Sequence, residues 1–217
     1  MAKLNLTLLV IIFSIFFSSA LVKPSLTKHN PHQTMSYIES SCNGTLYQDL
    51  CIRCLAKYVN HYSTIDGPHH LAHVALSVSL SRALHTRGYL FKLAKELKTI
   101  KNKREYLTVK DCANQITDSV DQISQAIKEL SRFSQHGSTI NDGMLWHISN
   151  VETWVSTALT DASSCVDSFS GVRMSKRMAA IKVKAQNVAE VTSNALALFG
   201  KYALRFQKAA ARTTKKP

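Results

Sequence analysis

The 217-residue sequence predicts an all-α fold, an up-down-up-down bundle of four long helices, from three observations. The chain holds only seven Gly and four Pro, which leaves few turns for a many-stranded sheet. Apolar residues recur at spacings of three and four over long stretches, which is the period of an amphipathic helix. The segments between these stretches are short, as the connections of an antiparallel bundle are.

Residues 1–20 are predicted to be a secretory signal peptide. Lys3 precedes an uncharged apolar segment, and Ser18 and Ala20 supply small residues at the −3 and −1 positions of a cleavage site. A membrane anchor is the alternative, because the segment is almost long enough to span a bilayer. The small residues after the apolar segment favour processing, so we expect secretion and no membrane attachment once the signal is removed.

The next two segments are a leader and a short helical region. Residues 21–36 are polar and contain two prolines, which predicts a flexible leader. Residues 37–66 contain two short apolar patterns around Cys42 and Cys51, which predicts two helices folded into a hairpin. Asp66 then stands before Pro68 as the N-cap candidate of the first long helix.

Four long helices are predicted between residues 67 and 206. The first runs from Pro68 to about Lys103, with Gly88 as a possible disturbance. The second follows Thr108, which with Asp111 resembles a capping box. One apolar stripe of this second helix contains Cys112, Ile116, Val120, Ile123, Ile127 and Leu130, and its other faces show Asp111, Asp118, Asp121 and Glu129.

The rest of the chain continues this pattern. Residues 135–143 are predicted to be a loop, and the third helix follows it and ends at Gly171. The fourth helix runs from about Met174 to Phe206, and residues 207–217 form a basic tail that we expect to be disordered. The folded domain therefore spans residues 37–206.

The charge of the chain is unevenly distributed. Residues 71–110 hold nine Lys or Arg against two acids, and residues 171–217 hold eleven against one. Residues 111–170 hold two basic residues against eight acids. This separation within a net charge of +13 predicts two surfaces with different partners.

Cysteine content fits an oxidising secretory route. The five cysteines are Cys42, Cys51, Cys54, Cys112 and Cys165, and most of them should be paired. An odd number leaves one thiol, either buried and inert or available to a partner. Asn43 begins an Asn-Gly-Thr sequon and is the predicted glycosylation site.

No pattern of catalytic residues is found in the sequence. There is no His-Glu-x-x-His, no Gly-x-Ser-x-Gly and no phosphate-binding Gly-rich loop. His69 with His73 could hold a metal, and Asp118 with Asp121 could act as acid and base, but solvated helix surfaces explain both pairs more simply. We expect a binding protein without cofactor or metal, and no nucleic-acid partner, because basic residues do not alternate with aromatic ones.

Four segments carry a resemblance to a known family. They are SCNGTLYQDLC at 41–51, DCANQITDSVDQISQAIKEL at 111–130, VETWVSTALTDASSCVDSF at 151–169 and NVAEVTSNALAL at 187–198. In this order they resemble the plant invertase and pectin methylesterase inhibitor family. The resemblance implies a bundle preceded by a hairpin, and two disulfides, Cys42 with Cys51 and Cys112 with Cys165. Cys54 is then the odd thiol, although its closeness to Cys51 leaves a swapped pairing open.

The resemblance also implies a function. Residues 37–206 would be an inhibitor domain, secreted to the apoplast and cell wall, that forms a 1:1 complex with pectin methylesterase and blocks its active-site cleft. Family inhibitors of this enzyme use mainly the second and third bundle helices. On those helices the partner-binding residues implied here are Asp118, Asp121, Gln122, Gln125, Glu152, Thr153, Ser156, Thr157, Thr160 and Asp161.

Two other functions remain open. Family invertase inhibitors carry Pro-Lys-Phe before the third bundle helix, whereas this chain has Ser138-Thr139-Ile140, so acid invertase is the less favoured target. A protein without inhibitory activity could instead hold acidic pectin, or a membrane surface, through the basic fourth helix and tail. The basic residues of that segment are Lys201, Arg205, Lys208, Arg212, Lys215 and Lys216.

Overall fold

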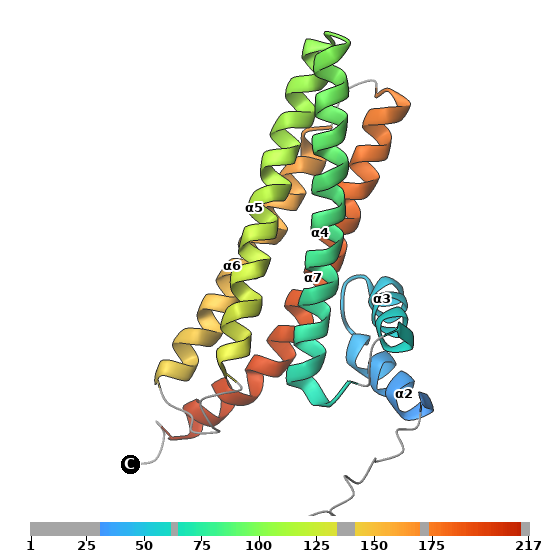
Figure 1. Ribbon diagram of the computed structural model, residues 1–217. Coiled ribbons are helices and arrows are strands. Elements are labelled where there is room, and N and C mark those ends of the chain that lie inside the picture. The colour runs from blue at the N-terminus through green and yellow to red at the C-terminus, as the bar shows by residue number, and fades with distance from the viewer. Residues whose placement is uncertain (1–30, 62–64, 134–141, 170–173, 214–217) are drawn as a thin grey trace, which may run out of the picture. The chain divides into compact units, whose positions relative to one another are not determined.

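The computed structural model describes residues 31–61, 65–133, 142–169 and 174–213. Every regular element in these ranges is an α-helix (Figure 1). The all-α class predicted from the apolar periodicity is confirmed. The predicted signal peptide, 1–20, lies outside the described residues.

Four long helices form the bundle. They are α4 (Gly67–Thr99), α5 (Lys103–Phe133), α6 (Asp142–Asp167) and α7 (Lys176–Thr213). Each contacts the next in sequence, and α4 also contacts α7, so the four enclose a common core. Consecutive helices run in opposite directions (Figure 1). Gly88 does not interrupt α4.

The core is built from the apolar stripes that the sequence shows. On α5, Cys112, Ile116 and Ile123 have no exposed surface. On α6 and α7, Val155 and Ile181 are equally buried. Burial of a Val, Leu or Ile side chain contributes about 1.5–3 kcal/mol, so these stripes are the main reason why the helices associate.

A helical hairpin precedes the bundle and consists of α2 (Pro31–Cys42) and α3 (Gln48–His61). Gly44 has a φ of +78° in the connecting turn, a conformation that L side chains rarely adopt. α3 contacts α4 and α7. The buried Asn194 side chain of α7 accepts a hydrogen bond from the Tyr47 amide (3.2 Å) and donates one to the Tyr47 carbonyl (2.9 Å). This pair of bonds fixes the turn to the bundle.

The predictions for the two ends of the domain were wrong in part. The predicted leader, 21–36, overlaps α2, which begins at Pro31 because a proline at the first helical position needs no hydrogen-bonded N–H. The predicted tail, 207–217, overlaps α7, which continues to Thr213 through three alanines, the strongest helix formers.

Two internal boundaries were also wrong. α5 begins at Lys103, where Asn102 Oδ1 accepts a hydrogen bond from the Glu105 amide (3.3 Å), and Thr108 is an interior residue whose hydroxyl donates to the Arg104 carbonyl. The predicted loop 135–143 overlaps α6, which begins at Asp142, a favoured residue at helix starts. The predicted end of this helix at Gly171 lies outside the described residues, and α6 ends at Asp167.

Candidate functional site

The helix pair α5–α6 is covalently linked. Cys112 and Cys165 form a disulfide with a Cα–Cα distance of 4.6 Å, and neither cysteine is exposed. The Ser119 hydroxyl donates a hydrogen bond to the Ala158 carbonyl and joins the two helices a second time. Both implied disulfides are present, because Cys42 and Cys51 are also bonded.

A polar stripe runs along α5 on the side of α6. Gln115, Asp118, Gln122 and Gln125 follow one another at spacings of three and four, so they share one side of the helix. Asp118 and Gln125 are exposed, and the other two are partly buried. Asp161 of α6 lies near enough to Asp118 for the two carboxylates to repel each other. The structure therefore brings together four of the implied partner-binding residues.

Three acceptor atoms of this surface have no hydrogen-bond partner among the described residues. They are Oε1 of Gln115, Oε1 of Gln122 and Oδ2 of Asp161, and all three are buried. Leaving such an atom unsatisfied costs about 1–3 kcal/mol. Burial, and then the Asp118 carboxylate, raise the pKa of Asp161.

The hydroxyl groups of α6 add further acceptors. Those of Thr157, Thr160 and Ser164 each donate to the carbonyl one turn earlier, at 2.9, 3.1 and 3.0 Å. Because the hydroxyl hydrogens are used within the helix, the oxygen lone pairs are what these groups can offer a partner. Carboxylates, amide oxygens and hydroxyl oxygens together suit a partner rich in Lys and Arg.

The implied residues do not all lie on one face. Glu152 and Asp161 are nine residues apart on α6, which is two and a half helical turns, so they lie on opposite sides. Ser156 is one turn after Glu152 and shares its side. Burial raises the pKa of Glu152. Thr153 and Asp121 are exposed. The polar face of this helix pair, which we call the α5–α6 surface, thus consists of Asp118, Gln122, Gln125, Thr157 and Asp161, and of Gln115, which the sequence prediction missed.

Glu129 is a buried charge, although the sequence predicted it on an outward face. Its side chain is 2% exposed and lies 2.5 Å from His147 Nδ1 and 2.8 Å from Arg132 Nη1. Asn150 Nδ2 donates to the same carboxylate at 3.4 Å. Burial by itself raises the pKa of Glu129, but the hydrogen bonds from His147, Asn150 and Arg132 lower it on balance. The Glu129 carboxylate therefore links α5 to His147 and Asn150 of α6, away from the α5–α6 surface.

The histidines at the start of α4 make structural contacts. His69 Nε2 lies 3.1 Å from the Leu130 carbonyl of α5, and His70 Nδ1 accepts a hydrogen bond from the Asp66 amide. Burial lowers the pKa of His73, and so do the neighbouring His69 and His70. Within the described ranges no group of three or more His, Cys, Asp or Glu is placed to hold a metal.

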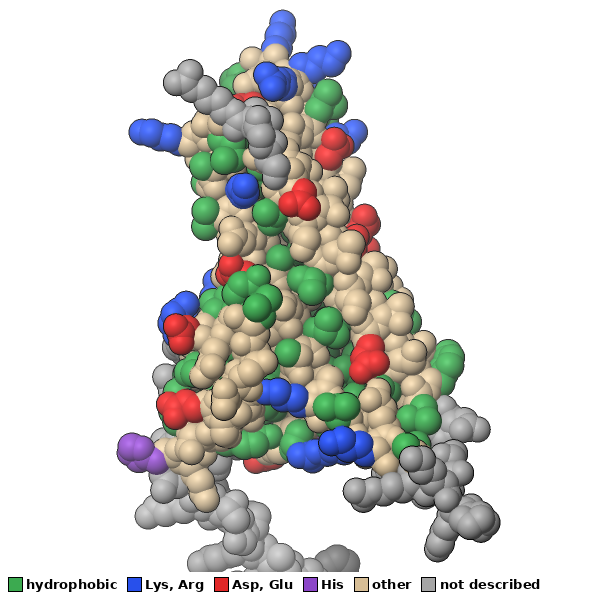
Figure 2. Space-filling model, turned by 180° about the vertical axis from the view of Figure 1, so that it is seen from behind, with side chains coloured by type: hydrophobic (Ala, Val, Ile, Leu, Met, Phe, Trp, Pro, Cys, Tyr) green, Lys and Arg blue, Asp and Glu red, His purple; other side chains and the backbone are tan. Residues whose placement is uncertain are grey.

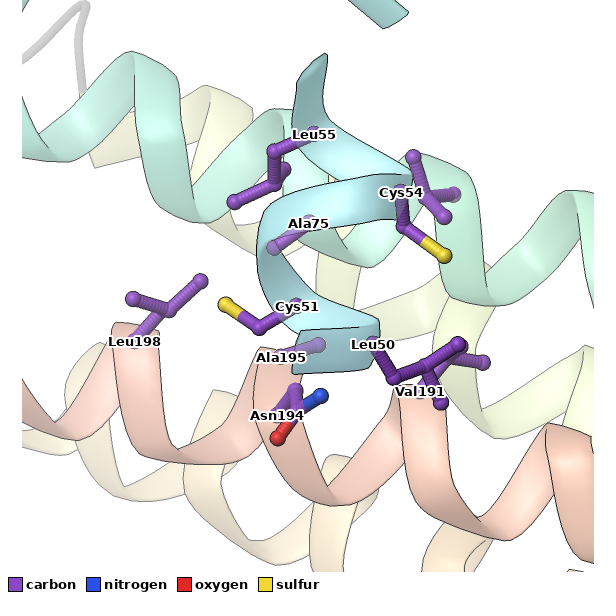
Figure 3. A pocket seen from close by; sticks show the side chains of 10 residues that line it. Leu50, Cys51, Cys54, Leu55, Ala75, Val191, Asn194, Ala195 and Leu198 are labelled. Atoms are coloured by element: carbon purple, nitrogen blue, oxygen red, sulfur yellow. The ribbon is translucent and has the colours of Figure 1, made fainter. Parts of the chain in front are cut away.

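Cys54 is the unpaired cysteine and lies between the hairpin and the bundle. It is partly buried beside a cavity of about 20 Å³, which is formed by Leu50, Val191, Leu198 and their neighbours. In Figure 3 the sulfurs of Cys51 and Cys54 point in different directions. A cavity of this size holds one water molecule at most. The thiol also borders a more open pocket of about 490 Å³ that is lined by Arg53, Lys57 and Arg82 among others, so it is only partly covered.

One residue of the predicted basic surface is engaged elsewhere. Lys201 Nζ donates to the carbonyls of Ser41 (2.8 Å) and Asn43 (2.5 Å), which ties α7 to the hairpin. Arg205 and Lys208 are exposed, whereas Lys215 and Lys216 lie outside the described residues. Asn43, the predicted glycosylation site, is exposed in the turn.

Asp161→Asn is expected to stabilise the protein at pH 7. Its raised pKa means that ionisation above this pKa destabilises the folded state, and an amide avoids this. We expect a gain of up to about 1 kcal/mol in urea unfolding, the size of one exposed charge interaction. The gain should disappear below pH 3.8, where the aspartate is protonated in both states. A loss of stability at pH 7 would contradict the conclusion that the ionised Asp161 destabilises the folded protein.

Comparison with known proteins identifies the family of the chain. The model of the family described as plant invertase/pectin methylesterase inhibitor matches residues 36–198. Pectinesterase inhibitor 9 of Arabidopsis thaliana is 39% identical over 205 residues, which cover 92% of this chain and 94% of that protein. Pectinesterase inhibitor 11 of the same plant is 35% identical over 176 residues, with 80% and 84% covered.

A solved structure is similar in fold. The crystal structure of a mutant form of a pectin methylesterase inhibitor from Arabidopsis matches with a TM-score of 0.53 and 19% identity, over 76% of this chain and 95% of that one. The family model covers well over half of the sequence, and two relatives exceed 30% identity over most of their length. The chain therefore belongs to the plant invertase/pectin methylesterase inhibitor family.

Proposed function

We propose that this protein is a secreted inhibitor of pectin methylesterase, that it binds the enzyme 1:1, and that it covers the active-site cleft with the α5–α6 surface. The observation that carries this proposal is the polar and acidic α5–α6 surface, on which the carboxylates of Asp118 and Asp161 lie close enough to repel each other. Carboxylates that repel each other in the free protein gain from the Lys and Arg side chains that a partner supplies. The relatives named pectinesterase inhibitors indicate which partner this is.

Inhibition of this kind needs no chemistry from the inhibitor. The disulfide between Cys112 and Cys165 holds α5 and α6 in one arrangement, so little conformational freedom is lost on binding. The acidic character of residues 111–170 accelerates encounter with a basic enzyme surface. Once bound, the helix pair excludes the polymer substrate from the cleft.

One segment of the sequence adds to the case for this target over acid invertase. Residues Ser138-Thr139-Ile140 replace the Pro-Lys-Phe of family invertase inhibitors, and they lie outside the described residues. Secretion rests on the predicted signal peptide. Within the described ranges, no helix has both the length and the apolar character that a membrane crossing needs.

Titration of the oxidised mature protein against a plant pectin methylesterase at about pH 5 to 6 is expected to abolish esterase activity at equimolar inhibitor. A parallel titration against acid invertase is expected to leave invertase activity unchanged. Activity assays with both enzymes measure this directly. Loss of invertase activity alone would overturn the choice of target, and no effect on either enzyme would overturn inhibition itself.

The surface is tested by reversing exposed charges. Asp118→Lys with Asp121→Lys should weaken inhibition roughly tenfold or more, mainly through slower association. Glu39→Lys with Asp49→Lys changes the net charge equally on the hairpin, where both acids are exposed, and should inhibit normally. If the hairpin variant alone loses inhibition, the enzyme binds the hairpin and not the α5–α6 surface.

A further inference from the structure

One end of the bundle carries a dense group of positive charges, which we call the basic tip. Lys and Arg side chains gather at the upper end of Figure 2, among a few acids. This is the end where α4 stops and α5 and α7 begin (Figure 1). The basic tip consists of eight exposed residues: Lys92, Lys95, Lys98, Lys101, Lys103, Arg104, Lys176 and Arg177. None of them forms an ion pair within the described part of the chain.

Contacts between α4 and α7 bring these charges to one level. Lys184 Nζ of α7 lies 4.9 Å from the ring centroid of Tyr89 on α4. Because the two helices are antiparallel, Lys176, eight residues before Lys184, lies near the level of Leu97, eight residues after Tyr89. The charges of α7 are therefore beside those at the end of α4, although they are about eighty residues apart in sequence.

Two of the helix starts carry cations where anions are normally favoured. Lys103 and Arg104 open α5 before the single acid of its first turn, Glu105, and Lys176 and Arg177 open α7, whose first turn holds no acid. A helix N-terminus already has a partial positive charge, so cations there destabilise the free protein. An external anion would offset this repulsion.

A pocket of about 240 Å³ lies between these two helix starts and the end of α6. Arg104 supplies a cation, Phe169 and Met178 supply apolar surface, and the hydroxyls of Thr108 and Ser175 supply polar groups. The other residues around it are Glu105, Ser168 and Met174. This mixture suits a sugar ring, which has apolar C–H faces, hydroxyl groups and, in a uronic acid, one carboxylate.

We infer that the basic tip is a binding site for an acidic polysaccharide, in which the pocket takes one uronate unit and the surrounding cations take its neighbours. A polyuronate carries one carboxylate per sugar, so a line of cations can engage it repeatedly. A membrane surface fits less well, because each exposed apolar side chain here has Lys or Arg within three residues of it, and lipid insertion needs a continuous apolar face. These apolar residues are Phe91, Ile100, Leu107 and Met174. This binding site is distinct from the α5–α6 surface, and polysaccharide binding there does not depend on esterase inhibition.

The test compares two variants of the whole mature protein with the same change in charge. The tip variant carries Lys103→Gln, Arg104→Gln, Lys176→Gln and Arg177→Gln. The control carries Arg53→Gln, Lys57→Gln, Arg205→Gln and Lys208→Gln, all at exposed positions on α3 and α7. Binding to immobilised polygalacturonate is measured as a function of salt, and highly methyl-esterified pectin tests the need for carboxylates.

The tip variant should bind polygalacturonate at least roughly tenfold more weakly than the parent, because four weak exposed contacts are lost together. The control should remain close to the parent, and binding should fall with salt and with methyl esterification. The tip variant should also unfold at the same or higher urea concentration, since it no longer opposes the helix dipoles. Unfolding therefore cannot explain its loss of binding.

Three results would overturn the inference. The parent could fail to bind polygalacturonate, the control could lose as much binding as the tip variant, or the tip variant could bind unchanged. Vesicles containing phosphatidylserine provide the comparison with membranes. Tip-dependent capture by these vesicles without capture by polygalacturonate would assign the tip to a lipid surface. Esterase inhibition by the tip variant is measured separately, so failure of this inference and failure of the proposed inhibitory function are distinguishable.

Discussion

Replacing Cys112 and Cys165 by alanine is expected to lower the free energy of unfolding by about 4 kcal/mol, because their bond closes a long loop in the unfolded chain. The two cysteines are 53 residues apart in sequence. They are also fully buried, so alanine leaves a small cavity at the α5–α6 contact. A loss of this size is a large fraction of the stability of an ordinary domain. We expect the variant to inhibit poorly as well, since the arrangement of the α5–α6 surface depends on the spacing of the two helices.

Urea unfolding measured by circular dichroism tests this expectation. The matched control replaces Cys42 and Cys51, which are only nine residues apart, and should lose about 2.7 kcal/mol on the same chain-entropy argument. The control should still inhibit the esterase, because the hairpin is not part of the α5–α6 surface. Equal loss of inhibition in both variants would show that overall stability, and not the geometry of α5 and α6, limits binding.

The second large effect is expected at Glu129. Replacing both Arg132 and His147 by alanine removes the guanidinium and the imidazole that contact the Glu129 carboxylate, which is only 2% exposed. We expect a loss of about 3 kcal/mol at pH 7, the lower end of the cost of an uncompensated buried charge, because Asn150 still donates to it. Adding Glu129→Leu should restore much of this loss, since an apolar side chain needs no partner there.

The pH dependence of this effect has a defined sign. The pKa of Glu129 is lowered in the folded state, so its contribution is complete above about pH 4.5 and is lost as the pH falls through the folded value. The stability difference between wild type and the double variant should therefore shrink between pH 7 and pH 3. Urea unfolding at both pH values measures it. A constant difference, or no rescue by Glu129→Leu, would show that the loss comes from packing.

The sequence was sufficient for the features that depend on one helix. The apolar stripe of α5, from Cys112 to Leu130, follows from spacing alone and is buried as predicted, apart from the partly buried Ile127. The disulfide pairs came from the family resemblance, because spacing allows several pairings among five cysteines. Helix ends were less predictable. At the start of α5 the side chain of Asn102 accepts a hydrogen bond from Glu105, a cap that competes in the sequence with an equally plausible one at Thr108.

Features that depend on two helices could not be predicted. Glu129 has the sequence environment of a surface acid, and only the approach of His147, eighteen residues later, makes its burial possible. Gln115 was missed because a glutamine on a polar helix face has no distinctive pattern. One signal was available for it, its position seven residues before Gln122, which places both on the same side after two turns.

The two bonds between Asn194 and Tyr47 have a consequence for the order of assembly. They join residues 147 apart, whereas each long helix contacts its immediate neighbour in sequence. Contacts between sequence neighbours form early and long-range ones late. We therefore expect the turn at Tyr47 to be fixed only after α7 has emerged from the ribosome and joined the bundle, whereas the contact of α3 with α4 can form earlier. During that interval all three thiols of the hairpin are open to oxidoreductases, whereas in the folded protein Cys42 and Cys51 are buried and Cys54 is partly covered, which protects the bond between the first two from exchange.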